Sequence, residues 1–179
     1  MIIYEKTLKS QKIYEGKMID LRVDTVKLPG EKHATREIVE HPGAVAIVPI
    51  TEEGKIIMIK QFRKPVDEAL LEVPAGKLDE NEDPSVCAAR ELKEETGYEA
   101  ENIKFLFKFY TSPGFSNEIM YLYVATQLTP GEAMPDEDEY IDMESYPLEK
   151  LLDMIHNGEI KDSKTIIGIM AAKTFLKAQ

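Results

Sequence analysis

Two hydrophobic periods divide the chain into strands and helices. Apolar and polar residues alternate at residues 19–28, which is typical of a half-buried strand, whereas residues 44–50 are apolar on both faces, as in a central strand. Helical spacing follows residue 83 and returns after residue 147. The predicted strands are residues 2–8, 11–15, 19–28, 35–41, 44–50, 55–62, 70–73, 103–110, 119–125 and 141–146. The predicted helices are residues 84–96, 147–157 and 164–177. This order of elements predicts an α/β fold in which helices cover the faces of a mixed sheet.

The first 42 residues form a separate segment in this pattern. They contain strands and turns but no helix, and the dipeptide Lys9-Ser10 separates the first two predicted strands. Such a segment has little core of its own, so its apolar residues need a partner surface. A small antiparallel sheet that caps the main domain and a dimerisation segment both meet this need. We therefore divide the chain into residues 1–42 and residues 43–179.

Composition and charge limit the classes of partner. The chain has 179 residues, 43% hydrophobic and 31% charged, which fits one soluble domain with a sizeable core. Its formal net charge of −11 opposes binding to nucleic acid or to an anionic membrane surface. The single cysteine excludes an internal disulfide, and the longest apolar run, residues 44–50, is too short to span a membrane. A cytoplasmic location is the resulting expectation.

The helix predicted at residues 84–96 carries the candidate chemistry. Its Glu91, Glu94 and Glu95 stand at positions i, i+3 and i+4, so their carboxylates share one face. Like charges at this spacing cost about 0.2–0.5 kcal/mol per pair, and a divalent cation with oxygen ligands would offset that cost. A solvated acidic face is the simpler interpretation, but the helix has a single lysine, Lys93, and Arg90 precedes Glu94 in the weaker orientation for an ion pair.

The stretch from residue 76 to residue 98 also matches a known motif without a gap. It reads GKLDENEDPSVCAARELKEETGY: a glycine, five residues, a glutamate, seven residues, then Arg-Glu, an apolar residue, any residue, Glu-Glu, any residue, a glycine and an apolar residue. The chain therefore resembles the Nudix hydrolases. The resemblance implies an α/β/α sandwich and a Mg²⁺-dependent enzyme, with Mn²⁺ as a substitute. It implies these metal ligands: Ala75 through its carbonyl, Glu91, Glu95 and, in an assisting role, Glu94. It gives Arg90 and Glu82 supporting roles, and Gly76 a close turn.

Three further stretches narrow the resemblance to the ADP-ribose pyrophosphatases. They are REIVEHPGAV at 36–45, QFRKP at 61–65 and TSPGFSNE at 111–118, which includes the proline typical of the subgroup. The implied reaction is hydrolysis of ADP-ribose to AMP and ribose 5-phosphate by a homodimer that exchanges its N-terminal segments. Arg63 would contact the diphosphate, Arg36 the adenosine side or a phosphate, and Glu118 the ribose hydroxyls or the adenine.

The acidic stretch PDEDEYID at 135–142 resembles the subgroup's loop that supplies a late glutamate. Glu139 is the predicted general base, and Glu137 assists it or binds metal, since the helix glutamates are committed to the cation. Two other functions stay open. One is hydrolysis of another nucleoside diphosphate derivative, a nucleotide sugar or FAD. The other is a non-catalytic module that senses such a nucleotide, which the intact Glu91, Glu94 and Glu95 disfavour.

Overall fold

The computed structural model describes residues 4–134 and 140–177. The chain divides into two compact units. The first unit comprises Met1–Gly43 and Tyr110–Ile119, and the second comprises Ala44–Phe109 and Met120–Gln179. The second unit contains the helix that carries the glutamates.

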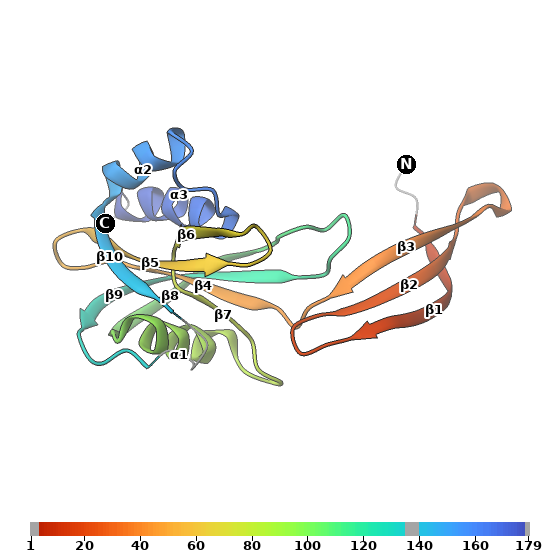
Figure 1. The fold of residues 1–179 in the computed structure, drawn as a ribbon, viewed down its shortest axis with the longest axis horizontal. Coiled ribbons are helices and arrows are strands. Elements are labelled where there is room, and N and C mark those ends of the chain that lie inside the picture. The colour runs from red at the N-terminus through yellow and green to blue at the C-terminus, as the bar shows by residue number, and fades with distance from the viewer. Residues whose placement is uncertain (1–3, 135–139, 178–179) are drawn as a thin grey trace. The chain divides into compact units, whose positions relative to one another are not determined.

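The first unit is built on a three-stranded antiparallel sheet in the order β1-β2-β3 (Figure 1). Its strands are β1 (Lys6–Glu15), β2 (Asp20–Lys27) and β3 (His33–Glu40), and a short 3-10 turn, η1 (Pro29–Glu31), joins the last two. Gly30 in that turn has φ of 72°, a left-handed conformation that glycine adopts without strain. Every residue of β1 is exposed, so this edge strand leaves apolar side chains open to solvent.

The predicted break at Lys9-Ser10 is wrong, because β1 runs through it without interruption. The strand keeps its pairing with β2 through two register irregularities, one between Thr7 and Lys9 and one between Lys12 and Tyr14. Such bulges absorb extra residues without ending a strand. Neither face of β1 is buried, so the strand has no strict apolar alternation to follow.

The hairpin tip at residues 110–119 belongs to the first unit, although the sequence division assigned it to the second domain. Val39 of β3 donates its N–H to the carbonyl of Phe115 at 2.8 Å and accepts from the N–H of Asn117 at 3.2 Å. The side-chain oxygen of Asn117 in turn accepts from the N–H of His41 at 2.8 Å. These bonds attach the tip directly to the end of β3.

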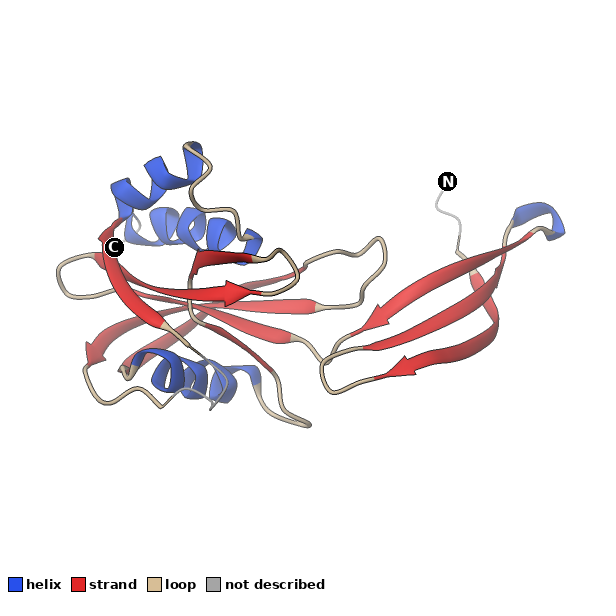
Figure 2. Ribbon diagram, in the orientation of Figure 1, coloured by secondary structure: helices blue, strands red, loops and turns tan. Residues whose placement is uncertain are grey.

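Among the residues that the structure describes, the second unit contains two sheets and three helices (Figure 2). One sheet has the order β10-β5-β6 and the other the order β7-β4-β9-β8. Strand β4 runs parallel to β9 and antiparallel to β7, so the second sheet is mixed as predicted. The strands are β4 (Ala44–Pro49), β5 (Lys55–Arg63), β6 (Glu68–Glu72), β7 (Ala75–Lys77), β8 (Glu99–Tyr110), β9 (Ile119–Thr129) and β10 (Asp142–Pro147). The helices are α1 (Pro84–Thr96), α2 (Leu148–His156) and α3 (Ser163–Lys177).

The central strand β4 faces a hydrophobic core on each side. Its Val45 and Ile47 pack with Leu92 of α1, whereas Ala46 and Val48 belong to the core that includes residues of α2 and α3. Figure 1 shows α1 on one side of the sheets and α2 with α3 on the other. Alternate side chains of a strand point to opposite faces, so a strand apolar throughout must lie between two cores. The predicted α/β/α sandwich is confirmed.

The strand predicted at residues 70–73 corresponds to β6, and the short strand β7 that follows it was not predicted. Pro74 separates β6 from β7, and the two strands pair in different sheets. A proline cannot donate a ladder hydrogen bond, which makes it a natural point for the chain to change sheets. In the part of the chain that the structure describes, no helix is long and apolar enough to cross a bilayer.

Candidate functional site

Local signals set the bounds of α1, the helix that carries the candidate ligands. Asp83 is the N-cap: its carboxylate accepts the N–H of Ser85 at 2.8 Å, and Pro84 takes the first helical position. Gly97 ends the helix with φ of 74° and donates its N–H to the carbonyl of Lys93 at 2.8 Å. The observed bounds of α1 are therefore those of the helix predicted at residues 84–96.

Arg90 lies at the centre of the acidic face of α1. One guanidinium nitrogen, Nη1, donates to Glu91 at 2.7 Å and to Glu94 at 2.8 Å. The other side of the guanidinium forms a two-bond contact with Glu82, at 3.0 Å from Nε and 2.9 Å from Nη2. The pair of Arg90 with Glu94 therefore forms, although Arg90 precedes Glu94 in the weaker orientation. Arg90 therefore offsets much of the repulsion among these glutamates, which we had expected a divalent cation to offset.

The charges of this cluster are strongly coupled. The hydrogen bonds that Arg90 donates to Glu82 lower the pKa of Glu82 to about 2, and the same bonds raise the pKa of Arg90. Glu82 also accepts the N–H of Asp79 at 3.0 Å, which fixes the loop ahead of the helix. Arg90 and Glu82 thus tie this loop to α1, the supporting role that the resemblance implied for them.

Strand β7 lies directly against the glutamates of α1. The N–H of Ala75 donates to the carboxylate of Glu95 at 2.9 Å, and Glu95 is only 3% exposed. A Cβ built on Gly76 would lie 1.8 Å from the carboxylate carbon of Glu91, so a larger residue at this position would force the Glu91 carboxylate to move. Gly76 lies in strand β7 rather than in the predicted turn, and the structure brings Ala75, Glu91 and Glu95 together.

The donor chemistry of this face fits a hard divalent cation. Carboxylate and carbonyl oxygens are the ligands that Mg²⁺ prefers, and the missing Cβ of Gly76 leaves space for Glu91 beside β7. Within residues 4–134 and 140–177, however, no three His, Cys, Asp or Glu side chains converge as a ready metal cage. Arg90 holds Glu91 and Glu94, and Glu95 accepts from the Ala75 N–H.

The structure places Arg63 in a network that the sequence did not indicate. Its Nε and Nη2 each donate to one oxygen of Glu72, both at 2.7 Å, and Glu72 is fully buried. Lys164 of α3 contacts the same carboxylate. The hydrogen bonds to Glu72 raise the pKa of Arg63, and the charge of Glu95 raises it further. Arg63 therefore lies within electrostatic reach of the glutamate face of α1.

The signal for Glu72 was present in the sequence as a charged residue in the middle of the apolar run LLEVPA. A carboxylate in such a run is almost always paired when it is buried. Its partner Lys164 lies 92 residues further along the chain, so sequence spacing could not identify it.

The other two predicted substrate contacts, Arg36 and Glu118, both lie in the first unit. Arg36 pairs with Glu5 and donates to the carbonyl of Thr35 at 2.9 Å. Its side chain is 42% exposed, and an exposed ion pair of this kind is weak. Glu118 accepts a hydrogen bond from the hydroxyl of Thr111 at 2.5 Å, across the base of the hairpin tip.

The predicted catalytic residues Glu137 and Glu139 lie outside the described residues. The segment that leads to them is described, and it contacts α1. Met134 donates its N–H to the backbone carbonyl of Glu94 at 3.0 Å, and a Cβ on Gly97 would lie 2.7 Å from the backbone nitrogen of Ala133. The chain therefore enters the acidic stretch from beside the candidate ligands.

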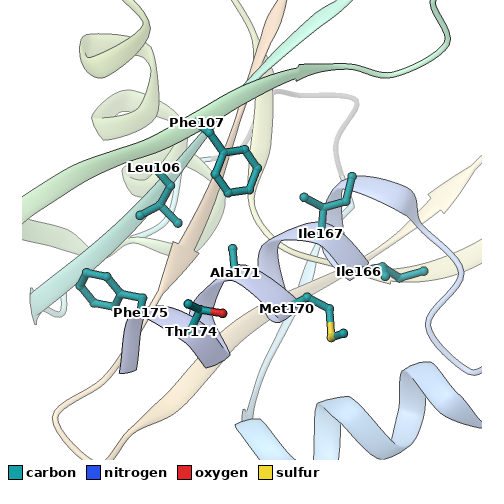
Figure 3. A pocket seen from close by; sticks show the side chains of 8 residues that line it. All are labelled: Leu106, Phe107, Ile166, Ile167, Met170, Ala171, Thr174 and Phe175. Atoms are coloured by element: carbon teal, nitrogen blue, oxygen red, sulfur yellow. The ribbon is translucent and has the colours of Figure 1, made fainter. Parts of the chain in front are cut away.

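A cavity of about 610 Å³ lies away from α1, between β8 and α3 (Figure 3). It is lined by Leu106, Phe107, Ile166, Ile167, Met170, Ala171, Thr174 and Phe175. These side chains offer a phosphate neither positive charge nor a set of hydrogen-bond donors. We therefore place the candidate site at the glutamate face of α1.

Comparison with known proteins agrees with this geometry. The NUDIX domain family matches residues 40–166, and the nucleoside diphosphate sugar hydrolase N-terminal domain matches residues 5–39. The methanol dehydrogenase activator of Bacillus methanolicus is 50% identical over 167 residues, covering 92% of this chain and 90% of the relative. The ADP-ribose pyrophosphatase of Bacillus subtilis (strain 168) is 46% identical over 179 residues, covering 98% and 97%. The crystal structure of an ADP compounds hydrolase has a TM-score of 0.87 at 23% identity, covering 98% of this chain and 95% of that one, and thus shares the fold.

Proposed function

Because the chain belongs to the Nudix family, we propose that it is a pyrophosphohydrolase that splits ADP-ribose into AMP and ribose 5-phosphate. The observation that carries the proposal is the intact Nudix motif on α1, with Gly76 and Ala75 packed against Glu91 and Glu95. The substrate follows from the similarity to the ADP-ribose pyrophosphatase along almost the whole chain. A cytoplasmic location is part of the same proposal.

The proposed metal ligands are Glu91, Glu95, Glu94 and the carbonyl of Ala75. Members of this family need a divalent metal, and we propose Mg²⁺, with Mn²⁺ as a substitute. When bound, the cation neutralises the diphosphate and activates a water molecule. The role of the protein is to hold these oxygens in place: β7 does so through the Ala75 N–H, and Arg90 does so through its contacts with Glu82 and Glu91.

The proposed substrate contacts supply the positive charge that an anionic ligand needs in a chain of net charge −11. Arg63 would bind the diphosphate, since its guanidinium lies within electrostatic reach of Glu95. Arg36 would contact the adenosine side or a phosphate, and Glu118 the ribose hydroxyls or the adenine.

The direct test is a product analysis. We expect the purified protein, given Mg²⁺ and a panel of nucleoside diphosphate compounds, to release AMP and ribose 5-phosphate from ADP-ribose, with products resolved by chromatography. Omitting the divalent cation should abolish turnover. If ADP-ribose survives while another compound in the panel is cleaved, the substrate assignment is wrong but the reaction class stands.

A nucleotide sugar is the second candidate substrate. The match of residues 5–39 to the nucleoside diphosphate sugar hydrolase N-terminal domain favours it. The same panel decides between the two through the ratio of kcat/KM for ADP-ribose to that for each nucleotide sugar.

We also propose that the protein is a homodimer formed through its N-terminal unit. The motivation is β1, a fully exposed strand whose apolar side chains Leu8, Ile13 and Tyr14 are 47%, 52% and 58% exposed. An exposed apolar strand at a sheet edge is a ready interface or an aggregation hazard. Light scattering at micromolar concentration should give the mass of two chains.

A charge on this strand should disrupt the dimer. We expect Ile13→Glu to shift the mass toward that of one chain, whereas Ser10→Glu adds the same charge at a polar position of β1 and serves as the control. A wild-type monomer at micromolar concentration would contradict the proposal. A dimer that both variants leave intact would place the interface elsewhere.

A further inference from the structure

Glu72 connects three elements of the second unit through one buried carboxylate. It ends β6, Arg63 binds both its oxygens from β5, and Lys164 contacts it from the first turn of α3. Lys164 also lies 3.1 Å from the carboxylate of Asp162, the residue that caps α3 by accepting the N–H of Thr165 at 2.9 Å. The ammonium group of Lys164 therefore bridges two carboxylates.

The residues after Glu72 lead directly to the candidate ligands, and each is fixed to a different element. The Val73 N–H donates to the hydroxyl of Thr165 on α3 at 2.9 Å, and the Pro74 carbonyl accepts from Ile47 of β4 at 2.9 Å. Ala75 then donates to Glu95. The contacts of α3 thus reach the glutamate face of α1 through a short stretch of backbone in which each residue is hydrogen-bonded to a different element.

The charges in this network balance. Arg63 and Lys164 are positive, and Glu72 and Asp162 are negative. Lys164 is 9% exposed and Glu72 is fully buried, so solvent screens their two charges weakly, whereas the side chain of Arg63 is 38% exposed. Without Lys164, the charge of Glu72 would fall on Arg63 alone, and the group would become net negative beside the place proposed for a diphosphate.

We propose that Lys164 is a positioning residue for the substrate's diphosphate: by sharing Glu72 with Arg63, it keeps that guanidinium oriented and leaves it positive charge to offer an anion. The proposal rests on the proposed function, in which Arg63 contacts the diphosphate. Lys164 itself does not contact substrate. Its effect should therefore fall on binding, and on KM more than on kcat.

Lys164→Met tests this by removing the charge while keeping an unbranched side chain. We expect it to weaken binding of inorganic pyrophosphate, measured by calorimetry without divalent metal, by about tenfold, or ~1.4 kcal/mol. KM for ADP-ribose should rise by a similar factor, with kcat within about threefold. Lys164→Arg, which keeps the charge, should restore both values to near wild type. Lys161→Met is the matched control, because Lys161 pairs with Glu68 of β6 at 2.7 Å on the exposed surface.

A second variant, which removes a negative charge instead of a positive one, separates an electrostatic effect from damage to the fold. Asp162→Asn keeps an acceptor for the Thr165 N–H but removes a negative charge, so pyrophosphate affinity should stay the same or rise. If both Lys164→Met and Asp162→Asn weaken binding equally, or if Lys164→Met behaves like Lys161→Met, the positioning role is overturned. Arg63→Gln marks the other possible failure: if it leaves pyrophosphate binding unchanged, the proposed diphosphate contact is wrong and Lys164 has nothing to position.

Discussion

Replacing Glu95 by Gln is expected to lower kcat at least ~10²-fold while the fold stays intact, the low end of what one electrostatic catalytic contact contributes. Glu95 is almost fully buried, and its carboxylate accepts the N–H of Ala75 at 2.9 Å. A glutamine oxygen can keep that hydrogen bond but has no charge to offer a divalent cation. The measurement is steady-state turnover of ADP-ribose at saturating Mg²⁺, with circular dichroism to confirm the fold.

The matched control is Glu99→Gln. Glu99 is an exposed glutamate just after α1 that pairs with Lys93 at 2.6 Å, and its neutralisation should leave kcat near wild type. Metal binding provides an independent measure: millimolar Mg²⁺ or Mn²⁺ should raise the melting temperature of the wild type, and less that of Glu95→Gln. Near-native turnover in Glu95→Gln would overturn the metal assignment. An unchanged melting temperature in the wild type would argue against a metal site in the folded protein.

The sequence was most informative where structure is local. The bounds of α1 follow from a cap, a proline and a glycine that are all close to the helix, and their interactions do not depend on the rest of the fold. The central strand was equally clear, because Val45, Ala46 and Ile47 are apolar on both faces and only a strand between two cores buries both. The motif on α1 and its contact with Gly76 follow the same rule, since few residues separate them.

What the sequence did not show depends on long-range contacts. The pairing of Lys164 with Glu72 joins residues that are 92 positions apart, and its charges look unrelated in the sequence. Arg63 was assigned to the substrate without any sign that a buried carboxylate fixes two of its nitrogens. The course of β1 was misread for a related reason: an edge strand with no buried face carries no reliable hydrophobic period.

The general base must be a group other than the proposed metal ligands. Glu91, Glu94 and Glu95 are the proposed metal ligands, and a bound cation lowers their proton affinity, so none of them is a good base. The nearest acidic stretch in the sequence begins just after Met134, whose N–H donates to the carbonyl of Glu94 at 3.0 Å.

We therefore expect one of two substitutions in this stretch, Glu137→Gln or Glu139→Gln, to lower kcat by ~10²–10⁴-fold, the range usual for a general base. Glu139 is the predicted base and Glu137 the assisting residue. Each glutamine keeps the size of the side chain and removes only the proton acceptor, so KM should change little.

Glu132→Gln, at an exposed glutamate earlier in the same connection, is the control and should retain turnover. The readout is kcat as a function of pH for each variant, because losing the base should also remove the acidic limb of the profile. If neither Glu137→Gln nor Glu139→Gln lowers kcat more than about tenfold, the base lies in another segment of the chain.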